Sequence, residues 1–198
     1  NDTGSFTVKL SAWNNGCKDS IIKSNIVTVF PAVARFNPVY NCNNKKEVVF
    51  KDSSILPQSW LWDFGDGSTS TSPNPVHQFA AVQDYNVSLT VTNGSCSHTT
   101  TQVIKIIDEN PDFSILKDSV CKSLNASFIA INVNTDNIQS YIWDFGDGQS
   151  DTTSVNAVSH VYDSAGTFTV KLSVIDIRGC IETVTKPNII QVFSPKAN

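Results

Sequence analysis

One hexapeptide, Trp-Asp-Phe-Gly-Asp-Gly, occurs twice in this chain of 198 residues and constrains its fold more than any other feature. The second copy starts 81 residues after the first (62 to 143). Self-similarity at a fixed period indicates structural units of one kind arranged in tandem. The two copies are Trp62, Asp63, Phe64, Gly65, Asp66 and Gly67, and Trp143, Asp144, Phe145, Gly146, Asp147 and Gly148.

Three further landmarks repeat at nearly the same offset: an early cysteine, a histidine two residues before an aromatic residue, and a late cysteine. The small differences between the offsets are what short loop insertions produce, because loops tolerate changes of length. The landmarks therefore indicate that the whole unit is repeated, and not the hexapeptide alone. They are Cys42 and Cys121, His77 and His160, and Cys96 and Cys180.

Residues 1–30 resemble the end of such a unit without its beginning. Residues 4–11 nearly repeat residues 166–173, and residues 27–30 match residues 190–193. Because two strands alone are marginal in water, we expect the chain to be part of a longer array and to have neighbouring modules of the same chain as partners. The expected organisation is the C-terminal part of a truncated repeat at 1–30 and complete modules at 31–109 and 110–198.

The composition favours strands and excludes several classes of partner. Charged residues make up 16% of the chain and the formal net charge is −4, so the chain lacks the basic surface that nucleic acids and anionic membranes require. No apolar run approaches the roughly 20 residues of a membrane span. Apolar residues alternate with polar ones, as in Val87-Ser88-Leu89-Thr90-Val91, which predicts strands with one buried and one wet face in an all-β fold.

The hexapeptide itself predicts a core strand followed by a turn. Trp60, Trp62 and Phe64 alternate along the chain, so they lie on one face of a strand and are expected to form the centre of a core. The following Gly-Asp-Gly is expected to form a turn, since glycine adopts positive φ angles freely and an Asp side chain accepts hydrogen bonds from nearby backbone N–H groups.

The order Trp-Asp-Phe-Gly-Asp-Gly, His-x-Phe/Tyr, Gly-x-Phe/Tyr-x-Val-x-Leu-x-Val resembles the PKD (polycystic kidney disease) domain. The resemblance covers nearly the whole chain, as two modules and the tail of a third. It implies tandem immunoglobulin-like β-sandwiches of about seven strands each. It also implies an extracellular location, either at the cell surface or secreted.

The five cysteines allow more than one pairing. The repeat favours one bridge in each complete module, Cys42–Cys96 and Cys121–Cys180, with Cys17 left unpaired. An alternative joins neighbouring modules through Cys17–Cys42 and Cys96–Cys121 and leaves Cys180 for a following module. A third alternative is that all five are reduced. Either disulfide scheme places the chain in an oxidising compartment.

The repeated carboxylates and histidines invite a catalytic or metal-binding interpretation, which we do not favour. The pairs Asp63/Asp66 and Asp144/Asp147 belong to a repeated motif, and duplicating a turn is more ordinary than duplicating an active site. We expect no cofactor. The alternative is a calcium site, because some members of the resembled family bind calcium, but the spacing lacks the regular ligands of an EF-hand loop. His77 and His160 are expected to pack or form hydrogen bonds, and the chain is expected not to be an enzyme.

Cysteine-bearing PKD arrays rich in Asn, Thr and Ser resemble the large cell-surface adhesins and gliding-motility proteins of Bacteroidota, which are exported by the type IX secretion system. We therefore expect a non-catalytic, semi-rigid spacer or adhesion module that contacts a surface polysaccharide or protein ligand. The alternative is an accessory PKD array of a secreted protease or polysaccharide-degrading enzyme that aids binding to an insoluble polymer. An ectodomain of a polycystin-like receptor is a third interpretation.

Overall fold

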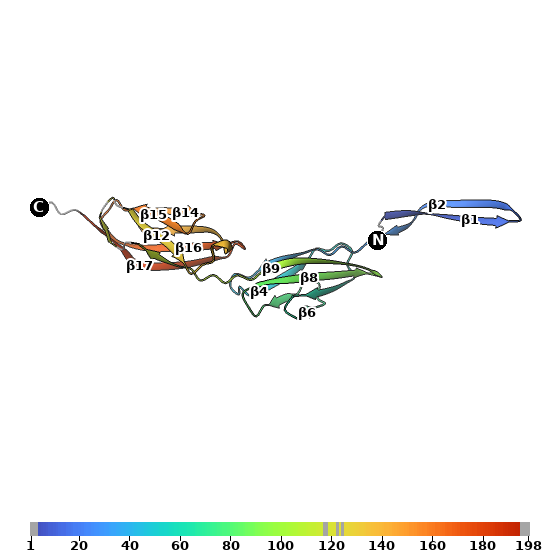
Figure 1. Ribbon diagram of the computed structural model, residues 1–198, viewed down its shortest axis with the longest axis horizontal. Helices are drawn as coiled ribbons and strands as arrows, with labels where there is room; N and C mark the ends of the chain where they lie inside the picture. Colours follow the sequence, from blue (N-terminus) through green and yellow to red (C-terminus); the bar gives the residue numbers. More distant parts are fainter. Residues whose placement is uncertain (1–3, 117–118, 122, 124, 195–198) are drawn as a thin grey trace. The chain divides into compact units, whose positions relative to one another are not determined.

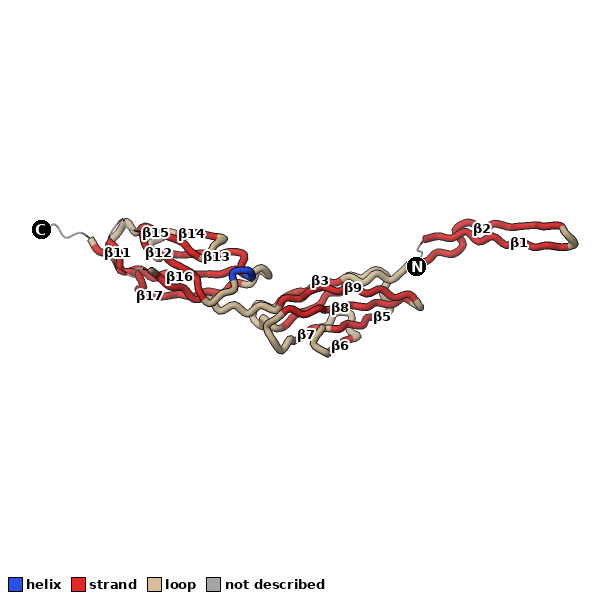
Figure 2. Tube along the Cα trace, in the orientation of Figure 1, coloured by secondary structure: helices blue, strands red, loops and turns tan. Residues whose placement is uncertain are grey.

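The computed structural model describes residues 4–116, 119–121, 123 and 125–194. These residues form strands, turns and one short 3₁₀ turn, η1 (Thr135–Asn137), so the all-β expectation is confirmed (Figures 1 and 2). The chain divides into two compact units, one formed by Asn1–Asn41 with Lys46–Ile106 and the other by Cys42–Lys45 with Ile107–Asn198. Among the described residues there is no apolar helix of membrane-spanning length.

The first unit contains a two-stranded hairpin, β1–β2, and a sandwich of two sheets. One sheet has the order β3-β4-β7 and the other the order β6-β5-β8-β9, and all of these pairs are antiparallel. The strands are β1 (Gly4–Asn14), β2 (Cys17–Val29), β3 (Phe36–Tyr40), β4 (Glu47–Asp52), β5 (Ser59–Asp63), β6 (Thr69–Ser70), β7 (Val76–Gln78), β8 (Asp84–Asn93) and β9 (Cys96–Lys105).

The second unit repeats this sandwich with the sheets β10-β12-β15 and β11-β17-β16-β13-β14. Its β11 pairs with β17 in parallel, and its other pairs are antiparallel. The strands are β10 (Asp112–Ile115), β11 (Ser119–Cys121), β12 (Asn125–Ile131), β13 (Ile138–Asp144), β14 (Ser150–Thr153), β15 (Ala157–Val161), β16 (Gly166–Asp176) and β17 (Ile181–Phe193).

Each unit has its own hydrophobic core between its two sheets. The alternating residues supply it: Val87, Leu89 and Val91 of β8 are fully buried, and the polar residues between them are not. β16 does the same in the second unit with Val170 and Leu172. Burial of one face of each sheet is what makes two antiparallel sheets stack as a sandwich.

Candidate functional site

The repeated tryptophans lie at the centre of each core. Trp62 on β5 and Trp143 on β13 are both fully buried. Trp62 meets Phe36 edge-on at 5.1 Å between ring centroids, and Trp143 meets Phe113 in the same way at 5.6 Å. Such edge-to-face pairs add about 0.5–1.5 kcal/mol beyond the burial of their surface.

The two indole N–H groups differ in their hydrogen bonding. Nε1 of Trp62 donates to the carbonyl oxygen of Ser72 at 2.8 Å. Nε1 of Trp143 is buried and has no acceptor among the residues that the structure describes. A buried donor without a partner costs about 1–3 kcal/mol, so Trp143 carries a penalty that the equivalent Trp62 does not.

The Gly-Asp-Gly segments are tight turns held by their own aspartates. Oδ1 of Asp66 accepts a hydrogen bond from the N–H of Ser68 at 3.0 Å, and Oδ1 of Asp147 does the same for Gln149 at 3.0 Å. The preceding aspartates accept in the same way from Gly65 and Gly146. Each carboxylate therefore stabilises the turn two residues ahead of it, which is the usual role of Asp in turns.

The first glycine of each turn is required by both its backbone and its neighbours. Gly65 and Gly146 have φ angles of +75° and +78°. A Cβ at Gly65 would lie 2.6 Å from the carbonyl oxygen of Asn86, and one at Gly146 would lie 2.2 Å from that of Thr169. The turn therefore packs against the neighbouring strand segment so closely that only glycine fits.

The repeated histidines tie these turns to the core. Nε2 of His77 lies 2.7 Å from Oδ2 of Asp66, and Nε2 of His160 lies 2.7 Å from Oδ2 of Asp147. Each imidazole also stacks on the aromatic residue of the hexapeptide at 4.0 Å between centroids, His77 on Phe64 and His160 on Phe145. Sequence reasoning assigned the histidines a packing or hydrogen-bonding role but missed the aspartate partner.

The surroundings of Asp66 favour its ionised form. Burial acts against ionisation, but hydrogen bonds from Ser68 and His77 outweigh it and lower the pKa of Asp66 to about 2. In the described residues, no group of three or more His, Cys, Asp or Glu side chains gathers as metal ligands. These carboxylates are engaged by turn N–H groups and by histidines.

A disulfide joins Cys42 to Cys180, with 5.3 Å between the Cα atoms. Cys42 begins the segment Cys42–Lys45, which belongs to the second unit although it connects β3 and β4 of the first along the chain. Nζ of Lys45 forms ion pairs with Asp108 at 3.0 Å and with Glu182 at 2.8 Å. Burial of Lys45 opposes its charge, but these two carboxylates outweigh that effect and raise its pKa.

Arg178 stabilises the hairpin between β16 and β17, which also carries Cys180. Its guanidinium pairs with Asp176 at 2.9 Å and donates to the carbonyl oxygen of Ile107 at 2.6 Å. Both partners of the ion pair are almost completely buried. Oδ1 of Asp176 accepts from the backbone N–H groups of Arg178 and Cys180, so the carboxylate fixes the backbone next to the disulfide.

This bridge contradicts both pairings expected from the sequence. Cys42 is bonded to Cys180 and Cys96 is a free thiol, so Cys42–Cys96 and Cys121–Cys180 are wrong. The alternative Cys17–Cys42 is wrong as well, because Cys17 is also free. The other bond of that alternative scheme, Cys96–Cys121, is also wrong, because Cys96 is free. The side chain of Cys121 lies outside the described residues, although its backbone in β11 is described.

Strand direction explains why the two cysteines of one module do not meet. In the second unit Cys121 lies opposite Phe193, whereas Cys180 precedes Ile181 at the other end of β17. Residues 181 to 193 of an extended strand span about 40 Å at about 3.3 Å per residue. A disulfide requires Cα atoms within about 7 Å, so these two cysteines are too far apart.

The first unit has the same arrangement. The N–H of Ala34 donates to His98 at 3.1 Å, and Gln102 donates to the carbonyl oxygen of Phe36 at 2.8 Å, so β3 and β9 run in the same direction. Cys96 lies at the start of β9, which we name the leading end of the sandwich. Asn41, next to Cys42, follows the end of β3 at the opposite, trailing end.

Comparison with known proteins agrees with a sandwich that occurs twice in the chain. The family described as the PKD domain matches residues 31–107 and 108–192. A microbial collagenase from Vibrio alginolyticus is 47% identical over 55 residues, which is 26% of this chain and 7% of the collagenase. The pre-pro-metalloprotease PrtV from Vibrio cholerae is 29% identical over 136 residues, which is 68% of this chain and 14% of PrtV. The chain thus spans a small fraction of the curated relatives that it matches.

Among solved structures, the PKD1 domain of Vibrio cholerae metalloprotease PrtV is 33% identical, with a TM-score of 0.36, and covers 39% of this chain and 98% of that domain. The PKD1 domain of Vibrio anguillarum Epp is 27% identical, with a TM-score of 0.36, and the match covers 39% of this chain and 94% of that domain. The PKD domain is a non-catalytic module. With two tandem matches over most of its length, this chain belongs to the PKD domain family.

Proposed function

We propose that this chain is a non-catalytic extracellular segment of a large bacterial cell-surface protein, and that it bears mechanical load as a semi-rigid spacer in attachment or gliding motility. The observation that carries the proposal is the Cys42–Cys180 bond. The relatives include a microbial collagenase and the pre-pro-metalloprotease PrtV, and collagen is an extracellular protein, which supports an extracellular location for this chain. Export by the type IX secretion system belongs to the same proposal.

The bond changes the path that a pulling force takes through the chain. Force applied between the two ends passes from Cys42 directly to Cys180, because the covalent bond connects them across a sequence separation of 138 residues. Residues 43–179, which include β4 to β16, are then outside the stretched path. Most of both sandwiches is thereby protected from being pulled out strand by strand.

The same bond stabilises the fold without any force. A crosslink that closes a long loop restricts the unfolded chain, and such bridges contribute about 2–5 kcal/mol. The proposal needs no cofactor and no catalytic group, since the repeated aspartates and histidines bond to one another and to turn N–H groups.

Single-molecule force spectroscopy tests the proposal. The oxidised chain should release only the contour length outside residues 42–180. Reduction should add about 500 Å, which is 138 residues at about 3.6 Å each. Cys42→Ser should behave as the reduced chain does, and Cys96→Ser, which leaves the bond intact, should match the oxidised chain. Equal lengths before and after reduction would contradict the proposed role.

A second candidate is favoured by the relatives themselves. Collagenases and a metalloprotease share this module, so the chain is alternatively an accessory array of a secreted hydrolase that helps it to bind an insoluble polymer. Sedimentation with fibrillar collagen, chitin and cellulose distinguishes the two. Retention of the isolated chain on one polymer supports the accessory function, and absence from all three supports the spacer.

A further inference from the structure

Three hairpins in this chain carry a cysteine at the same place. Cys17 is the first residue of β2 and pairs with Asn14, and Cys96 is the first residue of β9 and pairs with Asn93. Cys180 directly precedes β17 in the third hairpin. Cys180 is bonded, whereas Cys17 and Cys96 are free thiols. Among these three equivalent cysteines of the described hairpins, Cys180 forms a disulfide, and its partner Cys42 belongs to the preceding module.

The β1–β2 hairpin matches β16–β17 in detail. Gly4 pairs with Val29 as Gly166 pairs with Val192, and both hairpins shift register at equivalent points, between residues 6 and 8 and between residues 168 and 170. Asn25 and Asn188 both adopt positive φ, at 55° and 54°. A shared register, bulge and strained residue identify β1–β2 as the last hairpin of a further PKD module.

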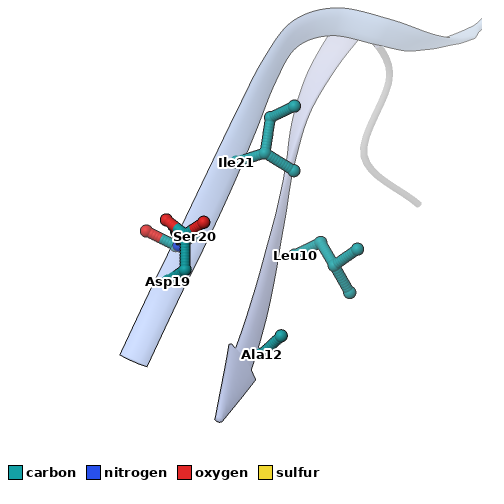
Figure 3. Close-up of a pocket in the computed structure, with 5 residues that line it drawn as sticks. All are labelled: Leu10, Ala12, Asp19, Ser20 and Ile21. Atoms are coloured by element: carbon teal, nitrogen blue, oxygen red, sulfur yellow. Dashed lines mark hydrogen bonds between the residues drawn. The ribbon is translucent and has the colours of Figure 1, made fainter. Parts of the chain in front are cut away.

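The apolar face of β1–β2 lacks the cover that its counterpart has. Val8 and Leu10 are 46% and 66% exposed, whereas the equivalent Val170 and Leu172 are fully buried. Leu10 and Ile21 line a shallow hollow on the two strands (Figure 3). In the second unit the equivalent face packs in one core with residues of β10 and β12, such as Phe113 and Phe128. The occupant of the exposed face is therefore the opposing sheet of a PKD sandwich.

The positions of the bonded pair indicate how consecutive modules are linked. Cys42 follows the trailing end of one sandwich, and Cys180 lies at the leading end of the next. Cys96 lies at the leading end of the first sandwich, which follows the module that β1–β2 completes. Cys180, the late cysteine of its module, is bonded to Cys42, the early cysteine of the module before it. If Cys96 follows the same pattern, its partner is the early cysteine of the module that precedes it.

We propose that Cys96 forms a disulfide with the early cysteine of the preceding PKD module, the one that ends in β1–β2, as Cys180 does with Cys42. Two thiols lose two protons and two electrons, which reduce one disulfide of a small-molecule or protein oxidant to two thiols. Each complete module then contributes its two cysteines to two different bonds, one toward each neighbour. This inference does not depend on the proposed mechanical role.

The test supplies the missing module and leaves four cysteines. A copy of residues 110–193 is joined to Pro31 of residues 31–198, because Phe193 is the repeat equivalent of Phe30. Cys180→Ser in the added copy and Cys121→Ser in the original part leave Cys121 of the copy together with Cys42, Cys96 and Cys180. Four cysteines allow three pairings, and each gives different linked peptides.

The fusion is refolded with oxidised and reduced glutathione, and its non-reduced peptides are mapped by mass spectrometry. The expected result is a bond between Cys96 and Cys121 of the copy, together with Cys42–Cys180, in more than nine-tenths of the monomer. Changing Cys121 of the copy to Ser should free Cys96 for alkylation and leave Cys42–Cys180 unchanged.

Several outcomes would overturn the inference. They are a free Cys96 in molecules that have formed Cys42–Cys180, a Cys42–Cys96 bond, a dimer linked through Cys96, and failure of Cys42–Cys180 to form. Failure of Cys42–Cys180 to form would overturn the inference because the predicted pairing pattern is taken from that bond. The bond also serves as the internal control for folding and oxidation. Loss of the length change under force, with the predicted pairing intact, would reject only the mechanical role.

Discussion

His77 is hydrogen-bonded to Asp66, with 2.7 Å between Nε2 and Oδ2, and the pair fastens the Gly-Asp-Gly turn to the core. The imidazole lies parallel to the ring of Phe64 behind it. The same contact recurs between His160 and Asp147 in the second module, so it belongs to the module and not to one site.

This contact predicts a pH dependence for the first module. The pKa of Asp66 is lowered from 3.8 to about 2, so its contribution is complete above about pH 4 and is lost as the pH falls through about 2. Asp66→Asn should lower the free energy of unfolding by about 1–2 kcal/mol at pH 7 and have little effect near pH 2. Urea titration with hydrogen exchange at Val87 and Leu89 measures it, with the exposed Asp84→Asn as control. A cost that is the same at both pH values would contradict the explanation.

The two tryptophans should respond differently to the same substitution. Trp62→Phe removes the hydrogen bond to Ser72 and should cost about 1 kcal/mol more than Trp143→Phe, which removes a buried N–H without an acceptor. Both lose similar packing, so the difference reports the hydrogen bond. Unit-resolved hydrogen exchange in each variant measures it, and equal costs would show that the Trp143 N–H is satisfied in solution.

Substitutions at Gly146 and Gly148 in the second turn distinguish the cost of a steric clash from the cost of backbone strain. Gly146→Ala should cost about 2–4 kcal/mol, because the new Cβ meets the carbonyl oxygen of Thr169 at 2.2 Å. Gly148→Ala is the matched control, since its φ is +92° but no atom lies within 4 Å of the new Cβ. It should cost about 1 kcal/mol. Thermal unfolding of the two variants provides the comparison, and a cost for Gly148→Ala as large as that for Gly146→Ala would remove the steric argument.

The buried ion pair next to the disulfide predicts a large effect from one substitution. Arg178→Ala leaves the carboxylate of Asp176 buried without its guanidinium and should cost about 3 kcal/mol in the second unit. Lys186→Met breaks a more exposed pair with Asp112 and should cost less than about 1 kcal/mol. Chemical unfolding of both variants measures the difference. An Arg178→Ala cost no larger than that of the control would mean that Asp176 is satisfied by its backbone donors alone.

Much of the fold could be predicted from local pattern. The alternation of Val87, Leu89 and Val91 specifies which face of the strand is buried, and the repeat of the hexapeptide specifies that the sandwich occurs twice. The Gly-Asp-Gly turns follow from residue chemistry, because glycine and aspartate have distinct roles in turns.

The cysteine partners could not be predicted in this way. Repetition shows that Cys42 and Cys121 are equivalent and that Cys96 and Cys180 are equivalent, but equivalence within a repeat does not show which end of the sandwich each one occupies. That depends on strand direction and on the parallel pairing of β11 with β17, which connects residues far apart in the sequence. The bond from Asp66 to His77 was missed for a related reason, since it joins a turn to another strand.

The bond between Cys42 and Cys180 can be tested by peptide mapping of the oxidised, non-reduced chain. We expect linked peptides that contain Cys42 and Cys180, with Cys17 and Cys96 alkylated as free thiols. Linked peptides that join Cys42 to Cys96, or an alkylated Cys42 in the folded monomer, would contradict it.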